Sequence, residues 1–254
     1  MIELRGVHKA FSGQPVLRGV DLLVPEGGTC ALMGVSGSGK TVLMKHLDGL
    51  LKPDRGTVCI DGEDLATLSA RELDEVRKKL GILFQAGALF DSLSVFDNVA
   101  FPLRERAQVP EADVARQVRS SLGLVGLQGA ESLFPSELSG GMQKRVAFCR
   151  AMVTQPRVLL YDDPTAGLDP LTTESVIDVI LTGKQRVGVT SFIVTPDVSV
   201  AFHVADRLAF LHEGRIIAYS PPEEFRRCEH PAVRAFLHNW LQRQPFRLPR
   251  MPPQ

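Results

Sequence analysis

The stretch GVSGSGKT, from Gly34 to Thr41, decides the fold because it is a complete phosphate-binding loop of the form GxxxxGK[ST]. The apolar residues 29–33 before it predict a buried strand, and residues 42–47 after it predict a helix. In that setting the glycines let successive N–H groups point inward, and the helix N-terminus favours an anion. Lys40 can reach the β- and γ-phosphates of a nucleotide, and the Thr41 hydroxyl can bind Mg²⁺. We therefore expect nucleotide contacts at Gly34, Ser36, Gly37, Ser38, Gly39, Lys40, Thr41 and Val42.

Two carboxylates follow a second expected strand, VLLYDD, which covers Val158 to Asp163. Four apolar residues indicate a buried parallel strand, and the acids leave its carboxyl end. Asp162 is the candidate for holding Mg²⁺, through water, and Asp163 is the candidate for activating the attacking water. A strand end with two solvated acids is the alternative interpretation.

Composition limits the class of protein. The chain has 254 residues with a formal net charge of +0, and it is 44% hydrophobic and 23% charged. These values suit one large α/β domain, or a core domain with a helical insertion. A neutral balance argues against a nucleic-acid partner, which would select a basic face. No run approaches about 18 apolar residues, so we expect no membrane span, and the direct start as a strand predicts no signal peptide.

The order of the other predicted elements suggests two α/β parts around a helical insertion. A helical pattern extends from Val95 to about Gln128, with Val114, Val118 and Leu122 on one apolar stripe. We expect further strands at 2–7, 16–24, 57–60, 80–84 and 190–195, a hairpin at 208–219, and helices at about 141–154, 172–183 and 231–243. Residues 244–254 are rich in Pro and Arg and are predicted to be extended or disordered.

GVSGSGKT, Gln85, LSGGM (Leu138 to Met142) and LLYDDPTAGLD (Leu159 to Asp169) occur in this order along nearly the whole chain. That order resembles the nucleotide-binding subunit of ABC transporters. The resemblance implies an α/β fold, namely a P-loop NTPase core of the ABC ATPase type with an antiparallel β subdomain and an α-helical subdomain. It implies a single domain over 1–243, with the helical subdomain at about 86–155 and a tail at 244–254.

Two longer segments resemble a narrower group. LFQAGALFDSLSVFDNVAFPLRE (Leu83 to Glu105) and PSELSGGM (Pro135 to Met142) are similar to the ATPase of Mla-type, Mce-associated phospholipid transport systems. This resemblance implies a membrane permease, an MCE-type lipid-binding subunit and a small STAS-domain protein as partners. It also implies a cytoplasmic location, peripheral on the inner face of the plasma (inner) membrane.

The resemblance further implies residue roles. Phe11 would stack on adenine, with a plain strand-end core residue as the alternative. Gln85 would sense Mg²⁺ and the attacking water, and so belongs with Lys40 and Asp163 among the catalytic candidates and with Thr41 and Asp162 among the metal candidates. The signature residues Ser139, Gly140 and Gly141 would complete the ATP site of an opposite subunit in a head-to-tail dimer, and Asp169 would cross that interface.

The same resemblance bears on two surface regions. Residues 90–101 would receive a cytoplasmic helix of the permease, although ordinary core packing is an alternative for this apolar stretch. The tail 244–254 would reach across to the neighbouring subunit. A solvated tail, or an arm that touches anionic lipid through its arginines, remains open for it.

Two departures from the family pattern concern hydrolysis. Asp163 stands where the family has Glu, and its carboxylate is set back by one methylene, about 1.5 Å. Pro196 stands where the family has a His that contacts the γ-phosphate, and proline offers no donor. Because the binding motifs are intact, the sequence predicts ATP binding with slow turnover.

Three classes of function compete. In the first, the chain is an ATPase subunit that powers lipid transport and has two weakened sites as a homodimer. In the second, it is a degenerate regulatory subunit that pairs with a catalytically complete ATPase chain. A soluble factor acting on ribosomes or DNA is disfavoured, because such proteins carry two cassettes or a coiled-coil insertion, and this chain has one cassette and no basic surplus.

Overall fold

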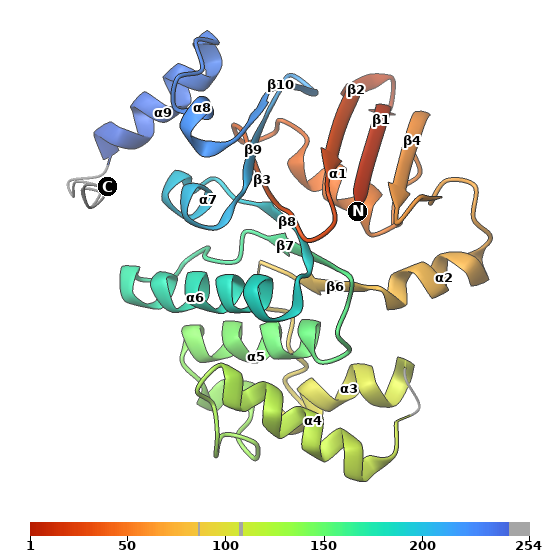
Figure 1. Cartoon of the computed structure of the whole chain (residues 1–254), viewed down its shortest axis with the longest axis vertical. Coiled ribbons are helices and arrows are strands. Elements are labelled where there is room, and N and C mark those ends of the chain that lie inside the picture. The colour runs from red at the N-terminus through yellow and green to blue at the C-terminus, as the bar shows by residue number, and fades with distance from the viewer. Residues whose placement is uncertain (86, 107–108, 244–254) are drawn as a thin grey trace.

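An antiparallel sheet forms from the N-terminal strands (Figure 1). Its strands are β1 (Ile2–Phe11), β2 (Gln14–Val24), β4 (Arg55–Ile60) and β5 (Glu63–Asp64), in the order β2-β1-β4-β5. Ile2, Leu4 and Val7 of β1 are fully or almost fully buried and alternate with more exposed residues until a register shift after Leu4. The computed structural model describes residues 1–85, 87–106 and 109–243, so the tail expected at 244–254 lies outside the described residues.

A second sheet of six strands carries the functional edge. Its strands are β3 (Thr29–Met33), β6 (Leu80–Leu83), β7 (Val158–Asp162), β8 (Thr190–Val194), β9 (Arg207–His212) and β10 (Arg215–Ser220), in the order β10-β9-β3-β8-β7-β6. Neighbours from β9 to β6 are parallel, and β10 joins β9 antiparallel. Every residue of β3 and β8 is buried, as expected for central parallel strands covered on both faces.

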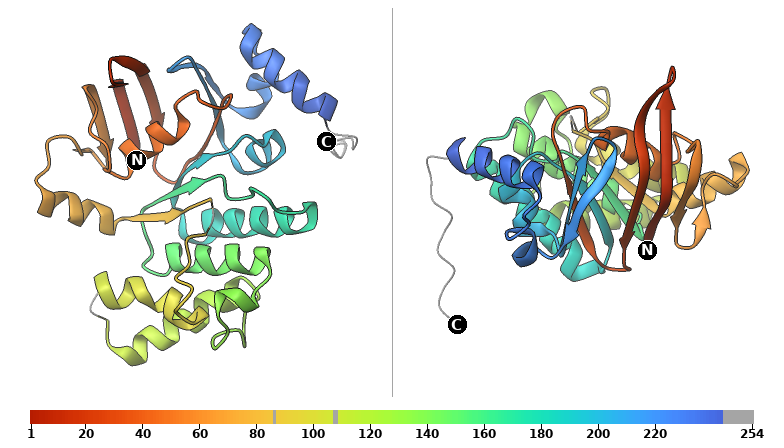
Figure 2. Two further views of the ribbon diagram at one scale, coloured as in Figure 1. Left: turned by 180° about the vertical axis from the view of Figure 1, so that it is seen from behind. Right: turned by 90° about the horizontal axis from the view of Figure 1, so that it is seen from above.

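Helices cover the second sheet and form a layer at one end of the molecule. The helices are α1 (Lys40–Leu47), α2 (Ala70–Lys78), α3 (Val95–Arg106), α4 (Glu111–Leu124), α5 (Gly140–Met152), α6 (Pro170–Val187), α7 (Val198–Val204), α8 (Pro222–Phe225) and α9 (Pro231–Arg243), with a 3₁₀ turn at Pro135–Glu137. Seen from behind, α3, α4 and α5 lie at the end opposite the antiparallel sheet (Figure 2). The expected fold class, with its antiparallel and helical parts, is therefore confirmed.

Several predicted boundaries were wrong for local reasons. The helical stretch expected from Val95 to Gln128 is two helices, the second of which starts after Pro110. Helix α6 begins earlier than expected, because Asp169 caps it, and it ends later, at a left-handed Gly188 with φ 66°. Strand β7 ends at Asp162 rather than Asp163, since Asp163 has left-handed backbone with φ 44°.

Three helices were not predicted, namely α2, α7 and the four-residue α8. Helix α2 begins with a capping box, in which the Ser69 hydroxyl accepts from Glu72 N and the Glu72 carboxylate accepts from Ser69 N at 2.8 Å. Helix α7 begins at Asp197, whose side chain accepts from the N–H groups of Ser199 and Val200. Both caps are visible in the sequence, but helices of 9 and 7 residues are too short to show a clear periodic pattern.

Candidate nucleotide site

The fold brings four separate sequence motifs to one edge of the parallel sheet. Because β3, β8, β7 and β6 are neighbours and parallel, their carboxyl ends meet at the same edge. The phosphate loop follows β3, Pro196 follows β8, Asp162 ends β7 and Gln85 follows β6. The expected loop, acids and glutamine are thus assembled at one edge from positions between Gly34 and Asp163 of the sequence.

The phosphate loop is held in a conformation that requires glycine. Gly34 and Gly39 have φ values of 154° and 105°, and a Cβ at Gly34 would lie 2.4 Å from the Leu211 carbonyl oxygen. Lys40 starts α1, and its ammonium donates to the carbonyl oxygens of Gly34 at 2.9 Å and Val35 at 2.8 Å. The lysine therefore folds back over the loop, inside the curve that a phosphate would fill.

The two carboxylates lie within electrostatic reach of that lysine. Burial lowers the pKa of Lys40, while the charges of Asp163 and Asp162 act to raise it. Burial raises the pKa of Asp162, against the charges of Lys40 and Lys45. One partly buried cation and two partly buried anions therefore share this edge, which is the charge pattern that a nucleotide phosphate and a divalent cation require.

Asp163 is held to the sheet through its backbone. Its N–H donates to the Val194 carbonyl oxygen at 2.8 Å, which ties it to the end of β8. Burial and then the neighbouring Asp162 raise the pKa of Asp163, and Lys144 and Lys40 lower it. Aspartate is among the residues that best tolerate left-handed backbone, so the residue type suits its φ of 44°.

Pro196 is exposed two residues after Val194, the backbone partner of Asp163, and it contributes no donor. The residue before it, Thr195, is buried, and its N–H donates to the Leu32 carbonyl oxygen at 3.2 Å. The residue after it caps α7. The turn after β8 is therefore tied to β3 on one side and to α7 on the other, and its proline offers no side-chain donor.

Gln85 has a partner that sequence reasoning missed. Lys144 of α5 is only 7% exposed, and its ammonium donates to the main-chain carbonyl oxygen of Gln85. Burial lowers the pKa of Lys144, while the charge of Asp163 acts to raise it. The only signal in the sequence was a lysine one turn after the signature glycines, which is ordinarily a solvated position.

The signature residues and Asp169 lie on helix starts rather than among the sheet-edge residues. Ser139 caps α5 by accepting from Met142 N at 3.3 Å, and Gly140 and Gly141 are the first residues of that helix. Asp169 caps α6 by accepting from Thr172 N at 3.1 Å. The predicted helix start at the signature is confirmed, and its role toward a second subunit stays a prediction.

Phe11 ends β1 and is 43% exposed, so it is not a core residue. The Lys9 ammonium lies 5.7 Å from its ring centroid. Its β-hairpin lies against the phosphate loop, because a Cβ at Gly39 would lie 3.1 Å from Leu17 and 3.2 Å from Val16. An exposed aromatic ring on that hairpin is compatible with adenine stacking, and this role stays a prediction.

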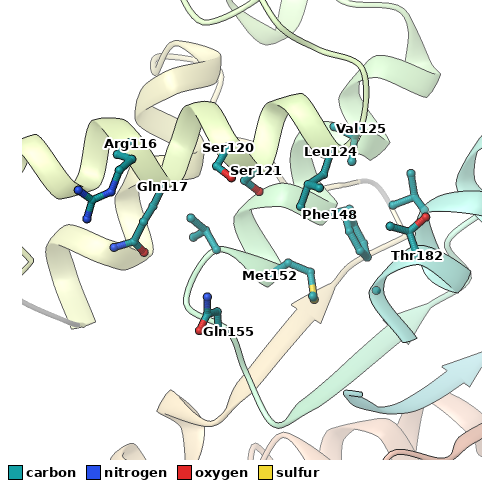
Figure 3. A pocket seen from close by; sticks show the side chains of 13 residues that line it. Arg116, Gln117, Ser120, Ser121, Leu124, Val125, Phe148, Met152, Gln155 and Thr182 are labelled. Atoms are coloured by element: carbon teal, nitrogen blue, oxygen red, sulfur yellow. The ribbon is translucent and has the colours of Figure 1, made fainter. Parts of the chain in front are cut away.

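Two of the hollows among the described residues lie beside α5, away from the phosphate loop. A cavity of about 320 Å³ lies between α4, α5 and α6, and Figure 3 shows Arg116, Ser121, Phe148, Met152 and Thr182 around it. None of the expected nucleotide contacts lines this cavity. A groove of about 400 Å³ is lined by the residues Leu80, Gly81, Ile82, Phe84, Ala88, Phe90, Phe101, Pro102, Arg150, Ala151 and Thr154.

The residues of the phosphate loop fit a nucleotide phosphate. The Ser38 hydroxyl oxygen is buried and has no hydrogen-bond partner among the described residues. Gly34 and Lys40 form the remainder of the cradle described above. An orphaned buried hydroxyl two residues from a partly buried ammonium is satisfied by an anion with several acceptor oxygens.

Known proteins share this arrangement. The profile of the family described as ABC transporter matches residues 17–166. A probable ribonucleotide transport ATP-binding protein, Mkl of Mycobacterium tuberculosis (strain ATCC 25618 / H37Rv), is 41% identical over 237 residues, which are 93% of this chain and 66% of that protein. The chain thus spans slightly less than two thirds of that relative. The intermembrane phospholipid transport system ATP-binding protein MlaF of Escherichia coli K12 is 38% identical over 250 residues, 98% of this chain and 93% of MlaF.

Solved structures agree with these relatives. The dimeric ATP-binding cassette MJ0796 bound to ADP and Pi superposes with a TM-score of 0.79 at 30% identity, covering 87% of this chain and 99% of that one. CbiO1 of Clostridium perfringens, part of the ABC transporter complex CbiONQ, gives 0.82 at 27% identity and covers 94% and 98% of the two chains. The profile match, the relatives and the shared fold show that this chain belongs to the ABC transporter family, as an ATP-binding cassette of the P-loop ATPase type.

Proposed function

We propose that this chain is the ATP-binding subunit of an Mla-type phospholipid transporter, and that it binds ATP with Mg²⁺ readily and hydrolyses it slowly. The observation that supports this most is the sheet edge. The complete cradle of Gly34, Ser38 and Lys40 lies there beside Asp162, whereas Asp163 and Pro196 at the same edge lack the side chains that the family uses for hydrolysis.

All the residues that would bind ATP and Mg²⁺ are present. Lys40 would exchange its two carbonyl partners for phosphate oxygens, and the Ser38 hydroxyl would gain its missing partner. Thr41, Asp162 and Gln85 would hold the magnesium ion. When bound, ATP and Mg²⁺ supply the γ-phosphoryl group and the cation that neutralises its charge.

The two positions that would promote hydrolysis carry less effective residues than the family pattern has. Asp163 would accept the proton of the attacking water, but its carboxylate is set back by about 1.5 Å relative to glutamate. A misplacement of about 1 Å in a catalytic group can cost about a hundredfold in rate. Pro196 removes a donor to the transferring phosphoryl group as well. We infer that turnover, rather than affinity, is reduced.

A phospholipid is favoured over a ribonucleotide as the cargo. MlaF is matched over 93% of its length and Mkl over 66%, and the segments 83–105 and 135–142 resemble the Mla type. The partners would be a permease, an MCE-type lipid-binding subunit and a STAS-domain protein. In the part of the chain that the structure describes, no helix is long and apolar enough to cross a membrane. We propose a cytoplasmic position against the inner membrane face.

The groove beside Gln85 suits the permease. Phe84, Phe90 and Phe101 are 43%, 44% and 39% exposed there, and the rings of Phe90 and Phe101 are 5.0 Å apart. Core packing accounts for other residues of the 90–101 stretch, since Val95 and Val99 are fully buried. An exposed aromatic cluster is an unusual surface feature and is typical of a docking site.

A head-to-tail dimer would complete the site, as the dimeric MJ0796 cassette suggests. The second candidate function, a degenerate regulatory subunit paired with a complete ATPase chain, is favoured by the same two departures at Asp163 and Pro196. Under it, the intact signature residues Ser139, Gly140 and Gly141 would serve the partner's competent site.

Transfer assays would test the transport function. The transporter that contains this chain is reconstituted in vesicles, and ATP-dependent movement of a fluorescent phospholipid is followed for the native chain and for Lys40→Ala. Movement that is lost in the variant supports the proposal. ATP-dependent movement of a ribonucleotide without any movement of lipid would contradict it. Addition of a catalytically complete cassette tests the regulatory alternative, because only that alternative predicts a large gain in ATP-dependent lipid movement.

A further inference from the structure

Thr172 in the first turn of α6 uses both branches of its side chain. The hydroxyl donates to Asp169 Oδ2 at 2.5 Å, and the Thr172 N–H donates to Asp169 Oδ1 at 3.1 Å. The Asp169 carboxylate is thus held at two atoms by one residue. A charge-assisted hydrogen bond of this kind fixes the side chain more firmly than a neutral one does.

The methyl group of Thr172 fills the space beside the signature glycine of α5. A Cβ at Gly141 would lie 2.3 Å from Thr172 Cγ2, a distance that two carbon atoms do not reach without movement. The other two Thr172 atoms near that point lie at 3.5 Å, which is ordinary contact. A Cβ at Gly140 would meet only Leu168, at 3.7 Å. Within the subunit, there is therefore room for a Cβ at position 140 but not at position 141.

The two contacts depend on each other, because the hydroxyl and the methyl share one Cβ. Turning the methyl away from Gly141 requires rotation about χ1, and that rotation moves the hydroxyl away from Asp169. Glycine near the start of α5 costs roughly 1 kcal/mol of helix propensity relative to alanine. The contact with Thr172 explains why glycine stands at position 141 despite this cost.

We propose that Thr172 is a positioning residue that ties the signature turn of α5 to the loop ending at Asp169, and that this contact within the subunit requires glycine at position 141. The two tied surfaces are those that the proposed dimer would present to the second cassette, so the role of the tie rests on the proposed function. Thr172 would keep them in one fixed relative position, and the nucleotide would meet both at once.

Thermal unfolding of the isolated chain without nucleotide tests the contact. Gly141→Ala should lower Tm by about 4–8 °C, from the usual cost of overpacking in a protein of this size. The double variant Gly141→Ala/Thr172→Ser removes Cγ2 and should recover most of that loss. Gly140→Ala is the matched control and should lower Tm by less than half as much. Equal losses at the two glycines, or no recovery in the double variant, would overturn the proposal.

ATP-dependent dimerisation tests the tie. Light scattering is recorded against ATP with Mg²⁺ in the Asp163→Asn background, which prevents turnover. Thr172→Val keeps a methyl group against Gly141 and loses the bond to Asp169, and it should need about tenfold more ATP for half-maximal dimer, whereas Thr172→Ser should need less than about twofold more. ATP affinity of the monomer should stay unchanged in both variants.

The outcomes separate the two proposals. Thr172→Val that dimerises like the parent chain would overturn the positioning role, since a merely structural defect would appear in Tm instead. A parent chain that binds ATP but does not dimerise would refute the proposed dimer and the role of Thr172 toward it. In that case the unfolding measurements would still decide whether the methyl group of Thr172 is the reason that position 141 requires glycine.

Discussion

Replacement of Lys144 by Met should slow ATP turnover much more than it changes stability or affinity. The ammonium of Lys144 is the buried link between α5 and the Gln85 carbonyl, and its charge lowers the pKa of Asp163. Methionine keeps a side chain of similar length and removes the donor and the charge. The change therefore affects two catalytic candidates and leaves the phosphate loop intact.

The magnitudes follow from opposing contributions. Loss of a hydrogen bond from a charged donor costs about 1.5–3 kcal/mol, and removal of a buried charge returns a desolvation cost of several kcal/mol. These contributions largely cancel, so we expect the free energy of unfolding to change by no more than about 1 kcal/mol and Tm by no more than about 4 °C. A carbonyl released from its anchor can shift Gln85 by about 1 Å, which costs about ten- to a hundredfold in turnover.

The assay is steady-state ATP turnover with Tm and ATP affinity measured on the same preparations. Lys144→Arg is the control, because it keeps the charge and a donor, and it should retain more than half of the native rate. If the native rate lies at the detection limit, the comparison is repeated in the Asp163→Glu/Pro196→His background. Turnover that is equal in the Met variant and the native chain would refute the reasoning, as would a large loss of affinity.

Three further predictions concern stability, pH dependence and docking. Ser69→Ala removes the capping box of α2 and should lower Tm by about 2–4 °C, whereas the exposed mid-helix change Ser120→Ala should not, as calorimetry would show. Because burial raises the pKa of Asp163 and the base must be ionised, turnover should fall with decreasing pH at a value above the ordinary aspartate pKa of about 3.9, and an acid limb at or below that value would contradict this. Phe101→Glu should reduce co-purification with the permease at least tenfold, and Leu23→Glu, at a somewhat more exposed residue on β2, should not.

The features that depend on local sequence pattern and on the order of the elements could be predicted from the sequence. The phosphate loop could be placed because a strand and a helix flank it, and the acid pair could be joined to it because parallel strands share a carboxyl edge. Gln85 was added through the family resemblance alone. The start of α5 at the signature could be predicted from small residues after a serine cap. These predictions depend on periodicity and capping within a few residues, and on the general rule that parallel strands share one carboxyl edge.

What could not be predicted depends on contacts between distant residues. Lys144 meets Gln85 across 59 residues of chain, and no local pattern marks a buried lysine on that helix. The contact between Gly141 and Thr172 exists only because α5 and α6 pack side by side. The left-handed backbone at Asp163 was hidden because an aspartate after a strand fits an extended chain equally well. Tertiary packing decided each of these.

The central claim is that binding and hydrolysis are separated in this chain, and ATP affinity measured beside turnover tests it most directly. The native chain should bind ATP as tightly as Asp163→Glu/Pro196→His does, and Lys40→Ala should lose binding. Turnover should be at least tenfold slower in the native chain than in the double variant, with Tm followed because glutamate fits the left-handed backbone at 163 less well. Equal turnover in the native chain and the double variant, at equal affinity and stability, would contradict the account.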